Sequence, residues 1–351
     1  MDARACCLAD RRTMTRPLAV GVVGLGFGAN HARVLSGLPG ARLAAVCDMR
    51  SERLDASSYG AARYDDLSSM LRSEPLDAVV VAAPAHLHAP MALAVIETGV
   101  AVLVEKPLAT SFQEGAVVVS AAAAAGVPLM PGHIERFNPA LRELTRRVRA
   151  GEIGRVLQLT ARRMGAIRYP PTDVNVVHDS AIHDIDAMRF VLACEVDEAY
   201  AVAQRGVVMP LEDAISGLLR FEPGKDMPGA VASLEVNWLS PRRVRDLTVL
   251  GETGMFVLHY ASQSLELYRT PARSGPVQGW SLGDDGQQAE TIAIEPREQL
   301  VEELSAFLNA VRRREAMPVS AEDGLAALAI ADALTESAHS GRPIKPMRAR
   351  A

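Results

Sequence analysis

A lysine stands where an apolar segment ends, in the sequence Val100-Ala-Val-Leu-Val-Glu-Lys-Pro107. The chain has three lysines against 34 arginines, so a lysine here departs from the usual choice of cation. Arginine stays protonated, whereas lysine is a compact donor whose pKa moves readily in a protein interior. Lys106 is therefore a candidate for proton chemistry. The alternative is a lysine kept by chance, as Lys225 and Lys345 are in a Gly/Pro loop and in the tail.

A glycine cluster, Gly24-Leu-Gly-Phe-Gly28, follows the apolar residues 18–23 and precedes an expected helix at 29–36. This order is typical of a dinucleotide-binding turn, where glycines let backbone N–H groups approach a pyrophosphate and the helix N-terminus faces the anion. Ala29 stands where the usual spacing has a third glycine, so the turn is either a G-x-G-x-x-A form or a shorter G-x-G-x-G form. The cofactor-binding residues predicted here are Gly24, Gly26, Phe27 and Gly28.

An aspartate, Asp48, ends the next apolar run at residues 42–47 and comes 22 residues after Gly26. That is close to the distance at which an acidic side chain meets the ribose hydroxyls of a dinucleotide. Asp48 therefore favours NAD as cofactor over NADP. Arg50 and Arg53 keep NADP open as the less favoured cofactor, because an arginine can hold a 2′-phosphate. The alternative for Asp48 is a turn residue at the end of a strand.

A second chemical cluster lies at residues 173–192, whose latter part predicts a helix. Asp179 and His183 are four residues apart, so they share one helix face and can hydrogen-bond or converge on a ligand. A histidine with an unperturbed pKa of about 6.5 suits removing or returning a hydroxyl proton while a hydride moves. Beside a dinucleotide fold this favours catalysis over the alternatives, a packed histidine and an aspartate that caps a helix.

The same segment also offers His178 and Asp184, and His86 and His88 lie upstream. These side chains could be read as metal ligands. Their spacing matches no established metal motif, and a hydride-transfer enzyme with lysine and histidine needs no ion. No metal site is predicted.

The N-terminal half alternates strands and helices, which predicts an α/β domain with a doubly wound parallel sheet. Such a sheet binds ligands at the carboxyl ends of its strands, where Pro84, His88, Glu105 and Lys106 fall. Strands are expected at 18–23, 42–47, 77–83, 100–104 and 127–130, and helices at 29–36, 88–98 and 111–125.

Beyond about residue 150, strand-like runs follow one another without helices between them. They predict an α+β domain with an open, mainly antiparallel sheet, one face of which is exposed or packed against another subunit. Strands are expected at 156–163, 199–204, 214–221, 230–238 and 246–250, and helices at 298–314 and 321–339. The predicted organisation is a disordered tail at 1–16, a Rossmann domain at 17–137, and a substrate and oligomerisation domain at 138–345.

Composition limits the classes of function. A chain of 351 residues that is 49% hydrophobic is long enough for two cores. The net charge of −5 and the lack of a basic stripe with aromatics exclude nucleic acid as a partner. No apolar run reaches the roughly 18 residues of a membrane helix. Four cysteines show neither metal spacing nor a disulfide framework, so a cytoplasmic location is expected.

Several motifs together resemble the glucose-fructose oxidoreductase / inositol dehydrogenase / MocA (Gfo/Idh/MocA) family of NAD(P)-dependent oxidoreductases. The resemblance runs from about residue 18 to 345. The motifs that carry it are Gly24-Leu-Gly-Phe-Gly28 with His31, Ala83-Pro-Ala-His-Leu-His88, Glu105-Lys-Pro107, Gly132-His133 with Arg136-Phe-Asn-Pro139, Gly151-Glu-Ile-Gly154, and Asp179-x-x-x-His183. The family often has Thr-Pro-Asn where this chain has Ala83-Pro84-Ala85, so side-chain hydrogen bonds to the cofactor at 83 and 85 are absent.

The resemblance implies a Rossmann domain, a C-terminal domain with an open sheet, and homodimers or homotetramers through that sheet. It also implies roles for three residues in a dehydrogenase that acts on a CH–OH group. Lys106 would lie near the reacting hydroxyl, His183 would act as acid or base, and Asp179 would hold either the histidine or the substrate.

Within the family, the segments around Gly132 and His183 are similar to the branch of UDP-N-acetylglucosamine 3-dehydrogenases, which act on nucleotide-linked amino sugars. Predicted substrate contacts are then Arg136, Asn138 and Arg163, with surface charge and turn capping as the alternative. A free cyclitol such as inositol, or an aminocyclitol, is the second expectation, because it needs fewer cationic contacts. A Rossmann protein that senses NAD or a sugar without turnover is an alternative of another class.

Overall fold

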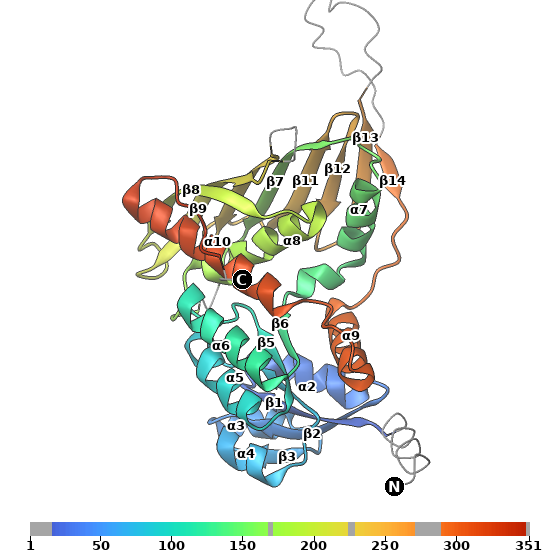
Figure 1. Ribbon diagram of the computed structural model, residues 1–351, viewed down its shortest axis with the longest axis vertical. Helices are drawn as coiled ribbons and strands as arrows, with labels where there is room; N and C mark the ends of the chain where they lie inside the picture. The colour runs from blue at the N-terminus through green and yellow to red at the C-terminus, as the bar shows by residue number, and fades with distance from the viewer. Residues whose placement is uncertain (1–15, 168–170, 224–228, 271–288, 349–351) are drawn as a thin grey trace, which may run out of the picture. The chain divides into compact units, whose positions relative to one another are not determined.

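The computed structural model describes residues 16–167, 171–223, 229–270 and 289–348, which form two compact units (Figure 1). Unit 1 takes its residues from 1–134, 298–329 and 347–351, and unit 2 from 135–297 and 330–346. Each domain of the sequence analysis is a continuous segment, whereas unit 1 also includes residues that follow unit 2 in the chain. The predicted tail lies outside the described residues apart from Arg16.

Unit 1 is built on a fully parallel sheet, which confirms the predicted doubly wound architecture. Its described strands run in the order β3 (Ala62–Tyr64), β2 (Ala41–Cys47), β1 (Leu18–Val23), β4 (Ala78–Val81), β5 (Ala101–Glu105) and β6 (Leu129–Gly132). Because the order reverses between β1 and β4, the crevice at their carboxyl ends is where a ligand binds in such a sheet.

Helices connect these strands (Figure 1). They are α2 (Gly28–Gly37), α3 (Ser51–Ser57), α4 (Leu67–Ser73), α5 (His88–Glu97) and α6 (Phe112–Ala125). Unit 1 also includes α9 (Gln299–Arg313) and the start of α10 (Ala321–Ser340), which follow unit 2 in the chain. The sequence analysis did not predict α3, α4 or β3, which are too short to show a clear period. The strand predicted at 77–83 is longer than β4. The Ala82 amide still donates to the Val23 carbonyl oxygen, but Pro84 has no N–H that could continue the hydrogen bonds of the strand.

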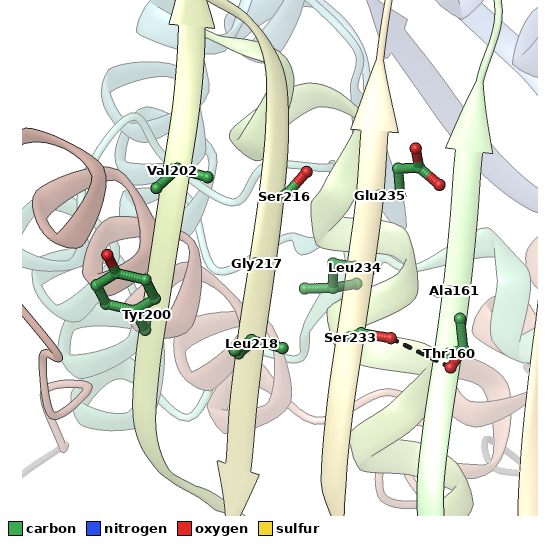
Figure 2. A pocket seen from close by; sticks show the side chains of 10 residues that line it. All are labelled: Thr160, Ala161, Tyr200, Val202, Ser216, Gly217, Leu218, Ser233, Leu234 and Glu235. Carbon is green, nitrogen blue, oxygen red and sulfur yellow. Dashed lines mark hydrogen bonds between the residues drawn. The ribbon is translucent and has the colours of Figure 1, made fainter. Parts of the chain in front are cut away.

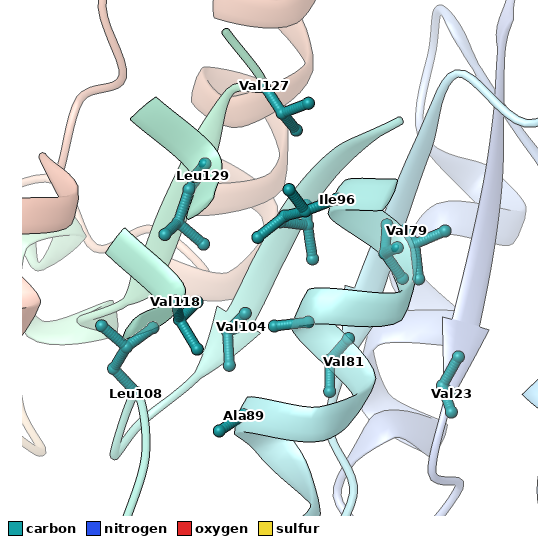
Figure 3. Packing of buried hydrophobic residues seen from close by; sticks show 14 of the residues in the cluster. Val23, Val79, Val81, Ala89, Ile96, Val104, Leu108, Val118, Val127 and Leu129 are labelled. Carbon is teal, nitrogen blue, oxygen red and sulfur yellow. The ribbon is translucent and has the colours of Figure 1, made fainter. Parts of the chain in front are cut away.

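The core of unit 1 lies between the sheet and the helices α5 and α6 (Figure 3). Alternate strand residues such as Val79, Val81 and Val104 point to this face and pack among Ile96 of α5 and Val118 of α6. Burying each such side chain contributes about 1.5–3 kcal/mol. This core fixes the strand ends that carry the predicted cofactor residues.

Unit 2 contains a mixed sheet in which only the β7–β10 pair of the described strands is parallel, so the predicted, mainly antiparallel sheet is confirmed. The strand order is β14 (Glu290–Ile292), β13 (Ser264–Arg269), β12 (Gly254–His259), β11 (Val244–Gly251), β7 (Val156–Met164), β10 (Val231–Asn237), β9 (Glu212–Phe221) and β8 (Val196–Arg205). The last three strands in chain order, β12 to β14, were not predicted.

One face of this sheet is covered by helices, namely α7 (Pro139–Arg149), α8 (Ile182–Leu192) and the later part of α10 (Ala321–Ser340). On β9, Ile215 and Leu219 are buried on this face, and Leu334 of α10 lies over Gly217. Because side chains alternate along a strand, Leu218 points to the opposite face and is exposed.

That opposite face carries a hollow of about 410 Å³ over β7 to β10 (Figure 2). Val202 and Leu218 line this hollow, beside Ser216 and Ser233.

In the described part of the chain, no helix is both long and apolar enough to cross a bilayer.

Candidate active site

The glycine turn after β1 is held against the segment that follows β4. Gly24 has φ +82°, and a Cβ there would lie 2.5 Å from Ala83 Cα, so only glycine fits. A Cβ at Gly28 would lie 3.2 Å from both Ala82 Cβ and Val22 Cγ1, and Gly28 is the first residue of α2. Close packing therefore requires glycine at 24 and leaves little room for a side chain at 28.

The start of α2 can receive an anion. Phe27 precedes the helix, and no side chain of the described residues caps its first N–H groups. Those groups and the helix dipole suit a phosphate. At Gly26 a Cβ would meet nothing nearer than Arg53 at 3.5 Å, so the backbone there is open to a ligand. The turn thus fits the pyrophosphate of NAD, with the Phe27 side chain 52% exposed beside it.

Asp48 joins the end of β2 to the glycine turn. Its Oδ2 accepts a hydrogen bond from the Leu25 amide at 2.6 Å, and its Oδ1 accepts one from the Arg50 amide at 2.9 Å. Arg53 Nη1 lies 3.3 Å from Oδ2. The carboxylate and the arginine thus stand together after β2. Contact of Asp48 with the adenosine ribose stays a prediction.

Lys106 is half-buried, directly after β5. Its backbone amide donates to Oε2 of Glu105 at 3.1 Å, and Oε1 of Glu105 accepts from His31 Nε2 at 2.7 Å. Gly132 on β6 leaves room for this arrangement, because a Cβ there would lie 3.1 Å from Glu105 Cα. Burial opposes the charge of Glu105, but the His31 hydrogen bond and the charges of His31, Lys106 and His88 lower the pKa of Glu105 below its usual value.

His88 and Pro84 occupy the other neighbouring strand end, after β4. Pro84 is exposed, whereas His88 is 2% exposed. His88 Nδ1 lies 2.7 Å from the Pro107 carbonyl oxygen, and Nε2 lies 2.7 Å from the Ala83 carbonyl oxygen. The predicted cofactor residues His88 and Glu105 thus direct their polar atoms at the protein itself. Their direct contact with the cofactor stays a prediction.

A buried carboxyl that the sequence analysis missed lies near this cluster. Glu303 of α9 is fully buried, and among the described residues neither of its oxygens has a hydrogen-bond partner. Burial, with the charge of Glu105, raises the pKa of Glu303 well above its usual value. A glutamate in an amphipathic helix gives no sign in the sequence that it faces inward.

In unit 2, Asp179 lies in a π-helical turn, Val177–Ala181, that runs directly into α8. Such turns recur at functional sites. His183 follows in the first turn of α8, and both side chains are half-buried. Asp179 Oδ2 accepts from the Ser180 hydroxyl at 2.8 Å, which in turn accepts from Trp238 Nε1 at 3.0 Å. The sequence analysis did not propose Ser180 or Trp238 as site residues.

The π-helical turn is capped by Asn175, another residue that the site prediction missed. Its Oδ1 accepts from the amides of Val177 and His178 at 3.1 Å and from His178 Nδ1 at 2.8 Å. His178 Nε2 contacts Asp332 Oδ1 at 2.7 Å. An asparagine two residues before a helix is a recognised local signal that the sequence analysis did not use. His178 is thus held by protein contacts that fix the turn.

The three predicted substrate contacts are buried in unit 2. Arg136 forms a two-pronged pair with Asp186, with distances of 2.8 and 2.7 Å. Asn138 caps α7 by accepting from the Ala140 amide at 3.0 Å. These contacts give Arg136 and Asn138 structural roles, and contact with substrate stays a prediction for both.

Arg163 is likewise paired, with Asp184 at 2.7 Å and with Glu135 at 3.1 Å. Burial opposes its charge, but these two carboxylates raise the pKa of Arg163 above its usual value. Its guanidinium also lies 5.1 Å from the centre of the Tyr260 ring. Contact between Arg163 and substrate likewise stays a prediction.

The predicted residues therefore fall into two groups. In unit 1, the glycine turn, Asp48, Glu105 and Lys106 gather at the carboxyl ends of β1, β2 and β5. In unit 2, Asp179 and His183 stand one turn apart. The first group can hold a dinucleotide, and both groups offer side chains that can exchange a proton with a hydroxyl.

Comparison with known proteins identifies both units. A sequence profile described as "Oxidoreductase family, NAD-binding Rossmann fold" matches residues 18–133, and one described as "GFO/IDH/MocA C-terminal domain" matches residues 141–257. The cofactor predicted from the glycine turn and Asp48 is thus the one that this family's Rossmann domain binds.

Two relatives are inositol 2-dehydrogenases. The chain is 31% identical to inositol 2-dehydrogenase 2 of Saccharopolyspora erythraea over 92% of its own length and 93% of that protein. It is 32% identical to inositol 2-dehydrogenase of Rubrobacter xylanophilus over 93% of each. A solved structure, UDP-N-acetylglucosamine 3-dehydrogenase of Acidithiobacillus ferrooxidans, aligns with a TM-score of 0.79 at 23% identity over 92% of this chain and 98% of that one, which supports the fold.

Proposed function

This chain belongs to the Gfo/Idh/MocA family of NAD-binding oxidoreductases, and on that premise we propose that it is an NAD-dependent dehydrogenase that oxidises a secondary hydroxyl of a cyclitol of the inositol class. The single observation that carries the substrate class is the pair of full-length relatives named as inositol 2-dehydrogenases. The sequence analysis had placed a nucleotide-linked amino sugar first. The relatives favour its second expectation.

The charges in unit 2 also support a substrate without phosphates. A nucleotide diphosphate needs cationic partners, and Arg136 and Arg163 were predicted to supply them. Both guanidinium groups are instead balanced by buried carboxylates, Asp186 for one and Asp184 with Glu135 for the other. A neutral polyol makes no such demand.

The proposed chemistry is the oxidation of one secondary hydroxyl. A base takes the proton of the reacting hydroxyl, the C–H bond of that carbon breaks, and a ketone forms. When bound, NAD accepts the hydrogen of that carbon with its two electrons and becomes NADH. We propose Lys106 as the group that binds and polarises the hydroxyl, His183 as the acid or base, and Asp179 as the group that orients His183 or the substrate.

We also propose that the protein is a homodimer or homotetramer through the open face of the unit 2 sheet. Val202 and Leu218 are each 57% exposed there, and Val231 is 49% exposed. Exposed apolar side chains gathered on one sheet face are typical of a subunit interface. A second copy of the chain would cover them.

The experiment that tests the function is NADH formation from NAD with a panel of inositols and inosamines, set against UDP-N-acetylglucosamine, UDP-glucose and free aldoses. Turnover confined to the cyclitols, and reduced about 1,000-fold or more in Lys106→Ala, would support the proposal. Turnover confined to UDP-sugars would restore the first expectation of the sequence analysis. Binding of NAD without turnover of any member would revive the sensing alternative.

A further inference from the structure

His88 begins α5 and is 2% exposed, yet both of its ring nitrogens are in hydrogen-bond contact with protein. Nδ1 lies 2.7 Å from the carbonyl oxygen of Pro107, and Nε2 lies 2.7 Å from the carbonyl oxygen of Ala83. The two carbonyls belong to different segments, one after β5 and one after β4. The ring therefore bridges two neighbouring strand ends of unit 1.

Each of the two carbonyls adjoins a functional feature. Pro107 directly follows Lys106, so one bond fixes the backbone on the carboxyl side of the lysine. Ala83 is the residue against which the glycine turn packs, since a Cβ at Gly24 would lie 2.5 Å from its Cα. His88 thus connects the segment that contains Lys106 with Ala83, against which the glycine turn packs.

The backbone on the amino side of Lys106 is held as well. Oε2 of Glu105 accepts from the Lys106 amide at 3.1 Å, while Oε1 accepts from His31 of α2 at 2.7 Å. Two buried side chains, Glu105 and His88, therefore hold the main chain on either side of one lysine.

The bridge depends on the protonation of the ring. A carbonyl oxygen only accepts, so an imidazole donates to two carbonyls only when it carries a proton on both nitrogens. Burial lowers the pKa of His88, and the charge of Lys106 acts in the same direction, whereas the two carbonyls and the charge of Glu105 oppose this. A neutral ring would keep one bond and turn a nitrogen lone pair toward the other carbonyl.

We propose that His88 is a positioning residue for Lys106, and that its ring sets the lysine against the cofactor turn by contacting both the Pro107 and the Ala83 carbonyl oxygens. The proposal rests on the proposed function, which gives Lys106 its catalytic role. Both ring nitrogens of His88 face protein carbonyl oxygens, so in this proposal His88 acts through Lys106.

Three substitutions separate the two bonds. The amide nitrogen of asparagine takes the place of Nδ1, so His88→Asn retains a donor toward Pro107 and the lysine. The amide nitrogen of glutamine takes the place of Nε2, so His88→Gln retains a donor toward Ala83. His88→Phe keeps a ring of similar size without a donor. Val118→Ala, a core change on α6 of the same unit, is the control for lost stability alone.

The measurements are kcat with the active cyclitol, the Kd of NAD and the Tm of each variant. We expect kcat to fall about 100-fold in His88→Phe and His88→Gln and by less than about 10-fold in His88→Asn, because a displacement of about 1 Å at a catalytic group costs this much. The Kd of NAD should stay within about 3-fold, since His88 acts on the lysine segment.

Three results would overturn the proposal. The first is equal kcat in His88→Asn and His88→Gln. The second is a loss of kcat no greater than that of Val118→Ala at matched Tm. The third is a loss explained by weaker NAD binding, which would make His88 a cofactor-binding residue instead.

A second readout needs no turnover and so separates this proposal from the proposed function. The chain has three lysines, so mass spectrometry can follow the reaction of Lys106 with an amine-specific reagent against Lys345, whose side chain is 76% exposed. We expect the rate ratio of Lys106 to Lys345 to change more than about 3-fold in His88→Gln and His88→Phe and less than about 2-fold in His88→Asn. An unchanged ratio in every variant would overturn the positioning role, whatever the substrate.

Discussion

His31 of α2 donates a hydrogen bond to Glu105 at the end of β5, with 2.7 Å between Nε2 and Oε1 and both side chains buried. The pair joins the helix that follows the glycine turn to the residue before Lys106. Removing one partner of a buried ion pair leaves the charge of the other partner buried and uncompensated. Such a substitution therefore lowers stability strongly.

Replacing Glu105 by Gln should therefore lower the free energy of unfolding by about 3 kcal/mol at neutral pH. The pKa of Glu105 is lowered in the folded protein, so its contribution is present above the unfolded pKa of about 4.3 and is lost as the pH falls through the folded pKa. Denaturant unfolding from acid to neutral pH measures this. A difference from wild type that does not shrink toward acid would contradict the account.

Glu303→Gln is the matched control, and its effect should have the opposite sign. The pKa of Glu303 is raised, so the folded protein keeps a proton that the unfolded chain releases. Its favourable contribution is present below the unfolded pKa and is lost as the pH rises through the folded pKa. The variant should equal wild type in acid and exceed it by about 1–2 kcal/mol in mild alkali. Parallel pH profiles for the Glu105 and Glu303 variants would refute both assignments.

Asp48→Asn should reduce the preference for NAD. The substitution keeps an acceptor for the Leu25 amide but removes the charge predicted to bind the ribose hydroxyls. We expect kcat/KM for NAD to fall about 10- to 100-fold, equivalent to a charged hydrogen bond of about 1.5–3 kcal/mol, while NADP changes little or improves. Arg53→Ala in the same background should remove any gain with NADP, and a gain that persists would show that Arg53 does not hold the 2′-phosphate.

Arg163→Met separates a structural arginine from a substrate-binding one. With Arg163 5% exposed and paired to Asp184 and Glu135, we expect a loss of about 3–5 kcal/mol in the free energy of unfolding. Arg146→Met is the control: Arg146 is exposed in its pair with Glu143, so the free energy of unfolding should stay close to that of wild type. Unchanged stability with a raised KM would instead favour the predicted contact between Arg163 and substrate.

Val202→Asp and Leu218→Asp should break the proposed oligomer, because a charge on each would have to be buried in the interface. Val117 of α6 in unit 1 is also 57% exposed, and Val117→Asp is the matched control. Light scattering after size exclusion gives the mass of each variant. A wild-type monomer, or oligomers that survive both sheet substitutions, would reject the open face as the interface.

The sequence predicts the regular parts of the fold well. β1 matches its predicted bounds, and α6 differs by one residue at its start, because long apolar runs and an N-cap serine at 111 leave little choice. The short elements β3, α3 and α4 were not predicted, and neither were the strands β12 to β14. Their local patterns are weak, and the sheet beside them decides their conformation.

For the site, the sequence identified residue types better than it identified contacts. The glycine turn and Asp48 follow from fixed spacing along a strand, turn and helix. Arg136 and Arg163 were predicted as substrate contacts because the sequence does not show which carboxylates pair with their charges. Their carboxylate partners, such as Asp186, lie up to 50 residues away, and only the fold brings them together.

The most direct test of the central claim follows the hydrogen atom itself. The enzyme would be incubated with NAD and inositol carrying deuterium on every ring carbon, and the NADH would be analysed by mass spectrometry. The account predicts NADH with one deuterium from the cyclitol, together with a keto product, and neither product with Lys106→Ala. Undeuterated NADH, or no NADH from labelled cyclitols while UDP-N-acetylglucosamine is turned over, would contradict it.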